Sequence, residues 1–243
     1  MSALATPSSL THLDDRIRSI AVAPLPAGNP ADVKASILLE VTIHARAKEL
    51  WQVMTRPREL RRWFSPVSGH TRRGGTFHVG DSSWGTVLSV VPERRFASTW
   101  NFDDRSSTLA IDLTPPFEPE FEETSTLVSL THASDLSSEA WESYGVLAVG
   151  AAWDALAYKL ALYLTDPGTL RIQRAIAAWE KSEDAAAFMT ESVQRWTEAT
   201  IEFGVDPAQA RAMQANTLEI MVAGPDESPV AGGPYGPGPT VGA

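Results

Sequence analysis

Two histidines are the best candidates for acid–base chemistry, because an imidazole titrates near neutral pH. His132 stands at the end of an expected strand, and His78 follows Phe77 in another. A histidine at a strand end commonly bonds to a nearby loop, and alternation along a strand turns His78 outward if Phe77 points inward. We therefore expect His132 to be structural and His78 to be exposed, and we keep both as weak catalytic candidates.

Other kinds of reactive site are poorly represented. The chain has no cysteine, which excludes disulfides, thiolate metal sites and cysteine nucleophiles. No pair of histidine or carboxylate residues has metal-ligand spacing, and no G-x-S-x-G, Walker or dinucleotide motif occurs. The adjacent pairs Asp103-Asp104 and Glu122-Glu123 should point to opposite faces, so neither forms a shared acid–base site. The sequence predicts no metal and no cofactor.

Aromatic side chains are the stronger signal. Tryptophan combines a large rigid apolar surface with one N–H donor, which suits the wall of a ligand pocket as well as a core. We predict that six aromatic residues line a ligand site: Trp63, Phe64, Phe77, Trp84, Trp100 and Trp153.

The elements that must position these residues are visible as hydrophobic periodicity. Alternating apolar residues predict strands over 35–43, 76–79, 83–91, 95–102, 107–114 and 125–132, joined as an antiparallel meander. Two short helices, 47–55 and 58–63, follow the first strand. A long helix over 137–164 carries one apolar stripe, which must be buried against the sheet. The predicted fold is α+β, with a curved antiparallel sheet wrapped around that helix.

Flanking segments complete the predicted organisation. Residues 1–32 are rich in Ala, Ser and Pro and predict a flexible arm, with a short ordered piece at 17–22. The main domain spans 33–165. A helical extension follows over 166–223, with clear N-cap residues and a Gly stop signal. Residues 224–243 are rich in Pro and Gly and predict a disordered tail, and deletion of 226–243 should leave stability unaltered.

Charge and hydropathy restrict the partners. The net charge of −10 disfavours nucleic acids and anionic membranes. The chain has neither a secretion signal nor a run of about 18 apolar residues, so we expect a cytoplasmic protein without a membrane span. The arginine-rich stretch 56–73 is the exception to the acidic character. It is either a solvated face or a docking surface for an anionic ligand or a protein partner.

Several stretches together resemble one known family. The segment IHARAKELWQVMTRPRELRRWFSP (43–66) resembles the opening motif of the heat-shock-protein-90 ATPase activator homologue branch of the SRPBCC, or START-like, superfamily. RRGGTFHV, VVPERRFASTWNF, TLVSLTHASD and GAAWDALAYKLALYL are similar to later parts of the family pattern. The resemblance covers about 33–164, and the last two helices look like an extension found on actinobacterial members.

The resemblance implies a helix-grip fold with a deep cavity between the sheet and the long helix. Members of the family bind apolar ligands or cyclise polyketides, so the fold does not determine the function. Our leading hypothesis is non-catalytic binding of a small apolar or amphipathic molecule. One alternative is an aromatase/cyclase-like enzyme that uses His78 or His132, which polar groups converging in the cavity would favour. Another is a stress- or chaperone-related interaction module acting through 56–73 or the C-terminal helices, which an exposed apolar stripe would favour.

Overall fold

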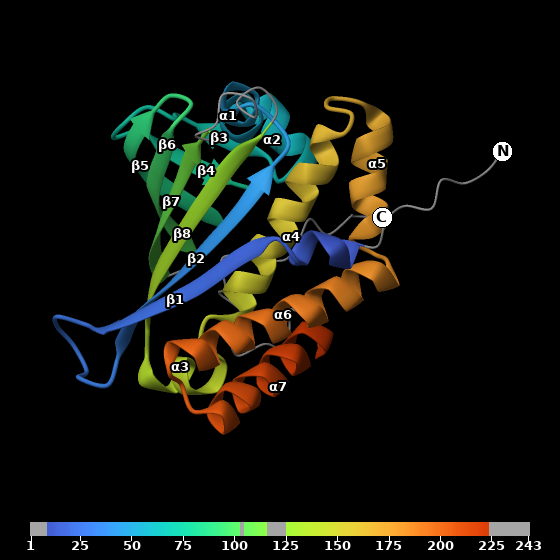
Figure 1. The fold of residues 1–243 in the computed structure, drawn as a ribbon. Coiled ribbons are helices and arrows are strands. Elements are labelled where there is room, and N and C mark those ends of the chain that lie inside the picture. Colours follow the sequence, from blue (N-terminus) through green and yellow to red (C-terminus); the bar gives the residue numbers. More distant parts are fainter. Residues whose placement is uncertain (1–8, 103–104, 116–124, 224–243) are drawn as a thin grey trace.

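A curved antiparallel sheet packs against helix α4 in the computed structural model, which describes residues 9–102, 105–115 and 125–223 (Figure 1). The eight described strands lie in the order β1-β2-β8-β7-β6-β5-β4-β3. Their bounds are β1 Arg16–Pro24, β2 Val33–Ile43, β3 Val67–Gly69, β4 Thr76–Val79, β5 Ser83–Val91, β6 Arg95–Phe102, β7 Arg105–Thr114 and β8 Thr126–Leu136. The described helices are a 3-10 turn Ser9–Leu13, α1 Ala47–Thr55, α2 Pro57–Trp63, α3 Ser138–Tyr144, α4 Leu147–Leu164, α5 Leu170–Trp179, α6 Glu183–Phe203 and α7 Pro207–Ala223.

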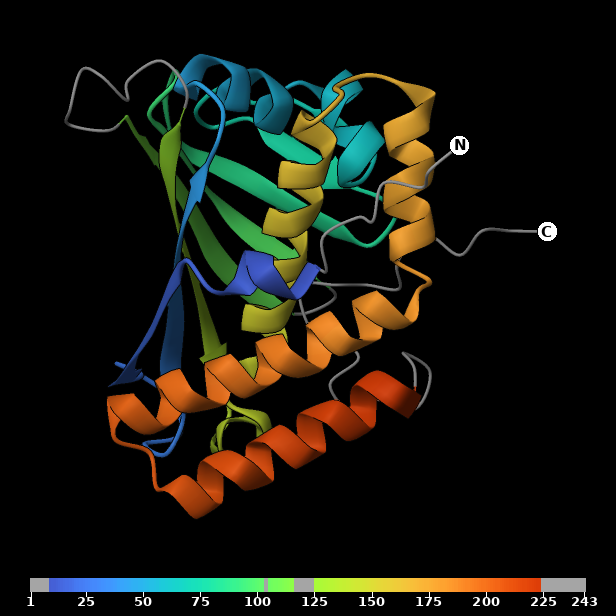
Figure 2. The same cartoon turned by 45° about the vertical axis from the view of Figure 1, so that its right-hand side comes forward.

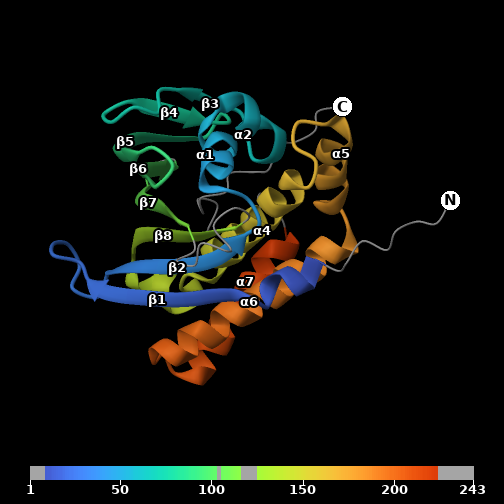
Figure 3. The same cartoon turned by 45° about the horizontal axis from the view of Figure 1, so that its top comes forward.

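The α+β helix-grip fold expected from the sequence is confirmed. The order of strand, two short helices, antiparallel meander and long helix is the predicted one, with β3 and β1 as additions. Helices α1 and α2 cover one end of the sheet, and α6 and α7 run side by side across the other end of α4 (Figures 2 and 3). The predicted tail over 224–243 lies outside the described residues.

The N-terminal segment differs from its prediction. Residues 16–24 form edge strand β1, so the ordered piece expected at 17–22 is part of a strand, and the prediction of a flexible arm is wrong for the rest of 16–24. This strand pairs with β2 along its whole length, from Arg16 opposite Val41 to Pro24 opposite Val33. Its side chains do not alternate cleanly between apolar and polar, so the periodicity of the sequence was a weak signal. The pairing depends on backbone hydrogen bonds to a strand that is distant in the chain.

The long helix also differs from its prediction. One helix was predicted over 137–164, but the chain forms α3 and α4 with a break at Gly145, whose φ is +55°. Glycine adopts this backbone conformation readily because it has no Cβ. A Cβ at this position would also lie 3.1 Å from the sulfur of Met213. The break therefore lets α3 turn away and pack against α7.

Helix α4 is covered on two sides. Trp153, Leu156 and Leu160 are buried on the sheet side, whereas Asp154 and Tyr158 are buried under the N-terminal segment and α6. The length and composition of α4 alone would suit a membrane span, although the sequence analysis expected none. In this structure α4 is the core helix, and its apolar side chains pack against the sheet and the neighbouring helices.

Candidate functional site

The main candidate site is an apolar cavity between the sheet and α4. Its volume is about 120 Å³, and only two of its lining residues, Thr55 and Thr71, carry polar side chains other than indole. The lining comprises Leu39, Val41 and Ile43 of β2; Met54, Thr55, Leu60, Trp63 and Phe64 of the α1–α2 region; Val67, Thr71, Phe77 and Val79 around β3 and β4; Phe96, Trp100, Leu109, Ile111, Val128 and Leu130 of β6–β8; and Trp153, Leu156, Ala157 and Leu160 of α4.

Five of the six predicted aromatic residues are brought together in this lining: Trp63, Phe64, Phe77, Trp100 and Trp153. Trp100 is central to the group. The centroid of its nearest ring lies 6.3 Å from that of Phe64, 6.2 Å from that of Phe77 and 6.4 Å from that of Trp153. These separations are within the range of tilted and edge-to-face aromatic pairs, which hold one another in place. The aromatic side chains of the cavity wall therefore form one contiguous group.

Trp84 does not belong to the site, and its prediction as a lining residue is wrong. It lies on the outer face of β5 and is 41% exposed. Gly85 takes the inward position instead, where a Cβ would come within 2.6 Å of the ring of Phe77. The alternation of side chains along β5 thus directs Trp84 to solvent so that Phe77 can occupy the interior.

His78 also lies on the outer face. It is exposed on β4 and pairs across the sheet with Trp84, whereas its neighbour Phe77 points into the cavity. This is the outward orientation that alternation along the strand predicts. His78 cannot act on a molecule held in the cavity.

His132 is buried, with both ring nitrogens engaged. Trp153 Nε1–H donates to Nδ1 at 2.9 Å, so the single proton of the neutral ring is on Nε2. Nε2–H then donates to Ser107 Oγ at 2.8 Å, and the Ser107 hydroxyl donates to the Trp100 carbonyl at 2.9 Å. Burial lowers the pKa of His132 to about 4. The ring is neutral near pH 7. Its hydrogen bonds hold Trp153 of α4 directly and, by way of Ser107, the backbone of Trp100 in β6.

A second cavity of about 100 Å³ lies beyond Trp100, between the ends of β6–β8 and the break before α4. Its lining is more polar and includes Ser107, His132 and Tyr144. His132 and Ser107 are hydrogen-bonded to each other, Trp153 Nε1–H is bonded to the other His132 nitrogen, and Arg105 and Asp135 are the charged residues of this lining.

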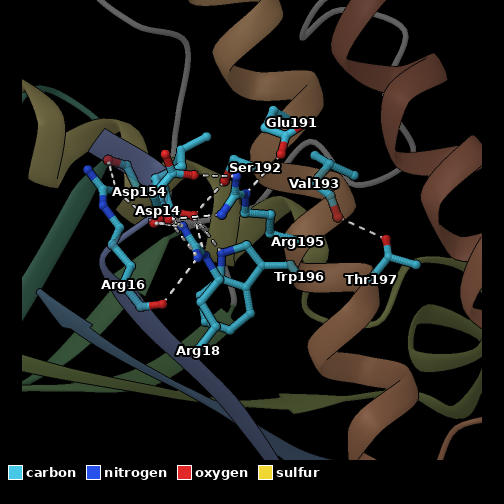
Figure 4. Close-up of polar contacts among 11 residues, drawn as sticks. Asp14, Arg16, Arg18, Asp154, Glu191, Ser192, Val193, Arg195, Trp196 and Thr197 are labelled. Carbon is cyan, nitrogen blue, oxygen red and sulfur yellow. Dashed lines mark hydrogen bonds and ion pairs between the residues drawn. The ribbon is translucent and has the colours of Figure 1, made fainter. Parts of the chain in front are cut away.

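A buried cluster of charged groups lies outside the linings of both cavities. The Asp154 carboxylate is fully buried and accepts hydrogen bonds from Arg16, Arg18, Ser192 and Trp196, at distances between 2.6 and 3.1 Å (Figure 4). These residues come from β1, α4 and α6. Burial lowers the pKa of Arg16, and Asp154 opposes that shift. The cluster ties β1 and α6, which are distant in the chain, to α4. Within the described part of the chain, no group of three or more His, Asp or Glu residues could hold a metal ion.

Sequence reasoning missed most of the aliphatic lining. Leu39, Val41 and Ile43 were recognised as one face of a strand, but nothing distinguished a face that lines a cavity from a face packed solid. Phe96 was likewise assigned only to a strand face. The alternation of apolar residues along β8, through Val128 and Leu130, was the sequence signal that could have identified part of this lining.

Comparison with known proteins agrees with this architecture. Residues 44–165, about half of the chain, match the family model described as "Activator of Hsp90 ATPase homolog 1-like protein". The solution structure of CalU16 from Micromonospora echinospora is 25% identical, with a TM-score of 0.57 over 77% of this chain and 96% of that chain. The crystal structure of CalU16 is 22% identical, with a TM-score of 0.55 over 76% of this chain and 97% of that chain. A conserved protein of unknown function from Enterococcus faecalis, EF2215, is 13% identical, with a TM-score of 0.52 over 79% of this chain and 96% of that chain. No curated protein matches this chain.

Proposed function

The chain belongs to the Activator of Hsp90 ATPase homolog 1-like family, and we propose that it binds a small apolar or amphipathic molecule in the cavity without transforming it. The observation that carries this proposal is the lining, in which aromatic and aliphatic side chains surround about 120 Å³ of space. Ligand pockets in proteins are typically concave and mostly apolar, with few polar groups.

The physical chemistry of such a cavity favours an apolar occupant. A water molecule needs two to four polar partners to be held inside a protein. The lining offers the two threonine hydroxyls, of which that of Thr55 already donates to the Trp51 carbonyl at 2.5 Å, and one indole N–H without a partner among the described residues, that of Trp100. A hydrocarbon group would remove apolar surface from water and form dispersion contacts with the aromatic wall.

The enzyme alternative gains no support from the cavity. Its lining contains no His, Asp, Glu, Lys, Arg or Tyr. General acid–base catalysis requires such a group within hydrogen-bond reach of the reacting atoms. His78 is outside, and both nitrogens of His132 are engaged.

The C-terminal helices give no support to an interaction module. Phe188 and Trp196 of α6 and Met213 of α7 are fully buried. Among the described residues of these two helices, Phe203 is the only large apolar side chain that is exposed, so no apolar stripe faces solvent. The helices cover α4 and have a structural role.

Native mass spectrometry of freshly purified protein is the first test, and a discrete mass excess that disappears on denaturation is the expected result. Binding of 1-decanol should then be measured by calorimetry for wild type and Ala157→Phe, which places a ring in the cavity. Filling the space should weaken binding by about tenfold or more, equivalent to about 1.4 kcal/mol.

Ala178→Phe is the matched control, because Ala178 is exposed on α5 and distant from the lining. It should bind 1-decanol as wild type does. Equal affinities for Ala157→Phe and Ala178→Phe would show that the ligand is not in the cavity and would refute the proposal.

A further inference from the structure

The position of the cavity mouth follows from the exposure of the lining residues. Thr71, in the connection between β3 and β4, is the one lining residue that is exposed. Thr55, Phe64 and Val67 are half-buried. The cavity is therefore open to solvent at Thr71. Strands β3 and β4, which this connection joins, lie beside α1 and α2 (Figure 3).

Positive charge is concentrated on the segments that contribute to this mouth. Arg72 and Arg73 directly follow Thr71, and Arg56 directly follows Thr55. The exposed arginines of the two segments, here called the arginine rim, are Arg56, Arg58, Arg61, Arg72 and Arg73. Glu59 is the acidic residue within 56–73, and it is engaged with Arg62 at 3.2 Å and with the Tyr163 hydroxyl at 2.6 Å.

In the described part of the chain none of the five rim arginines forms an ion pair, and the one carboxylate that senses a rim charge is Glu59, whose pKa Arg58 helps to lower, after the Tyr163 hydrogen bond and Arg62. By contrast, Arg95, Arg171 and Arg195 elsewhere on the surface pair with carboxylates at 2.6 to 2.8 Å. The chain as a whole has a net charge of −10, so a basic rim runs against its overall electrostatic character.

We propose that the molecule bound in the cavity is an amphipathic anion, with its apolar body inside and a carboxylate or phosphate group at the arginine rim. This inference rests on the proposed function and specifies the class of ligand. An ionised group cannot enter the apolar interior without a large desolvation cost, so it must stay at the mouth. Guanidinium groups match the geometry of carboxylates and phosphates, and the Thr71 hydroxyl is a further donor at the same place.

The test compares decanoate with 1-decanol, which share a chain length and differ in the charged end group. Dissociation constants are measured for wild type and for Arg72→Gln/Arg73→Gln, and the preference for decanoate over 1-decanol is compared between the two proteins. Because both ligands contain the same chain, the change in preference isolates the contribution of the rim. We expect the preference for decanoate over 1-decanol to fall about fivefold, because the variant removes two exposed charge pairs and each contributes a small factor to the affinity.

Lys181→Gln/Arg211→Gln is the matched control. Both of its residues are exposed and outside the cavity lining, and the substitution changes the net charge by the same amount. It should keep the wild-type preference. Raising the salt concentration to about 0.5 M should weaken decanoate binding and leave 1-decanol binding unchanged, because salt screens exposed charges. Decyl phosphate in place of decanoate shows which of the two anionic groups the rim prefers.

The outcomes separate the two proposals. If 1-decanol binds but the preference for decanoate is the same in Arg72→Gln/Arg73→Gln, the rim does not recognise the anion and this inference is overturned. If neither ligand binds to wild type, the proposed function fails and the inference fails with it.

Discussion

Replacing Asp154 by alanine should be among the most damaging single substitutions in this protein. Its carboxylate is 0% exposed and accepts five hydrogen bonds from side chains: two on Oδ1, from Arg16 and Arg18, and three on Oδ2, from Arg18, Ser192 and Trp196. The side chains of Arg16 and Arg18 are only 2% and 6% exposed. Removing the carboxylate leaves two guanidinium groups with little access to water and without their anionic partner.

The expected magnitude follows from that geometry. Removing one partner of a buried ion pair typically costs about 3–5 kcal/mol, since the remaining charge is buried and uncompensated. The whole free energy of unfolding of a typical domain is about 5–15 kcal/mol. Asp154→Ala should therefore lose a large part of the stability, and the loss should affect β1, α4 and α6 together.

Urea unfolding followed by far-ultraviolet circular dichroism measures the change, provided that the slope m stays constant. Asp166→Ala is the matched control: Asp166 pairs with Arg171 at 2.8 Å, but the two side chains are 34% and 77% exposed. Such a surface pair contributes about 0–1 kcal/mol. If Asp154→Ala and Asp166→Ala differ by less than about 1 kcal/mol, the buried cluster is not the tie that the structure indicates.

A replacement of the whole cluster provides a second check. Arg16→Met/Arg18→Met/Asp154→Leu removes all three charges, so no charge is left uncompensated, and only Ser192 and Trp196 lose the acceptor of their hydrogen bonds. Apolar replacements of buried ion pairs are often neutral or stabilising. The triple variant should therefore be more stable than Asp154→Ala, and a triple variant that is less stable would contradict the explanation from desolvation.

Three further predictions concern stability. Trp153→Ala should destabilise the protein by about 3–5 kcal/mol, because it removes a buried indole and leaves His132 Nδ1 without its donor; an unchanged urea midpoint would refute that placement. Gly150→Ala should destabilise it by about 1–3 kcal/mol, since the new Cβ would lie 2.4 Å from the indole of Trp196; wild-type thermal stability would contradict this packing. The pKa of His132 is lowered to about 4 in the folded state, below the 6.5 of an unfolded chain, so protons bind preferentially to the unfolded state as the pH falls. Stability should be fully present above pH 6.5 and should fall by about 2 kcal/mol between pH 7 and pH 5, with a smaller fall in His132→Gln, as urea midpoints at the two pH values will show.

Much of the fold could be predicted because its signals are local. The alternation of apolar residues along β2 and β4–β8, and the three- and four-residue spacing on α4, depend only on neighbours in the chain. For the same reason, five of the six aromatic residues predicted for the site line the cavity. Trp84 was misplaced because residue type alone does not say which way a side chain points; that depends on the register of β5 against Phe77.

What only the tertiary structure decided is where charge and backbone groups find partners. Strand β1 exists because β2 offers it a complete row of hydrogen bonds, not because its own side chains alternate. Asp154 is a charged residue in a mostly apolar helix, yet it is buried, because Arg16 and Ser192 reach it from positions 138 and 38 residues away in the chain. The neutrality of His132 depends likewise on its burial by residues that are distant in the chain. Periodicity in a sequence reports which face of an element is apolar, whereas the burial of a charge depends on which distant groups fold against it.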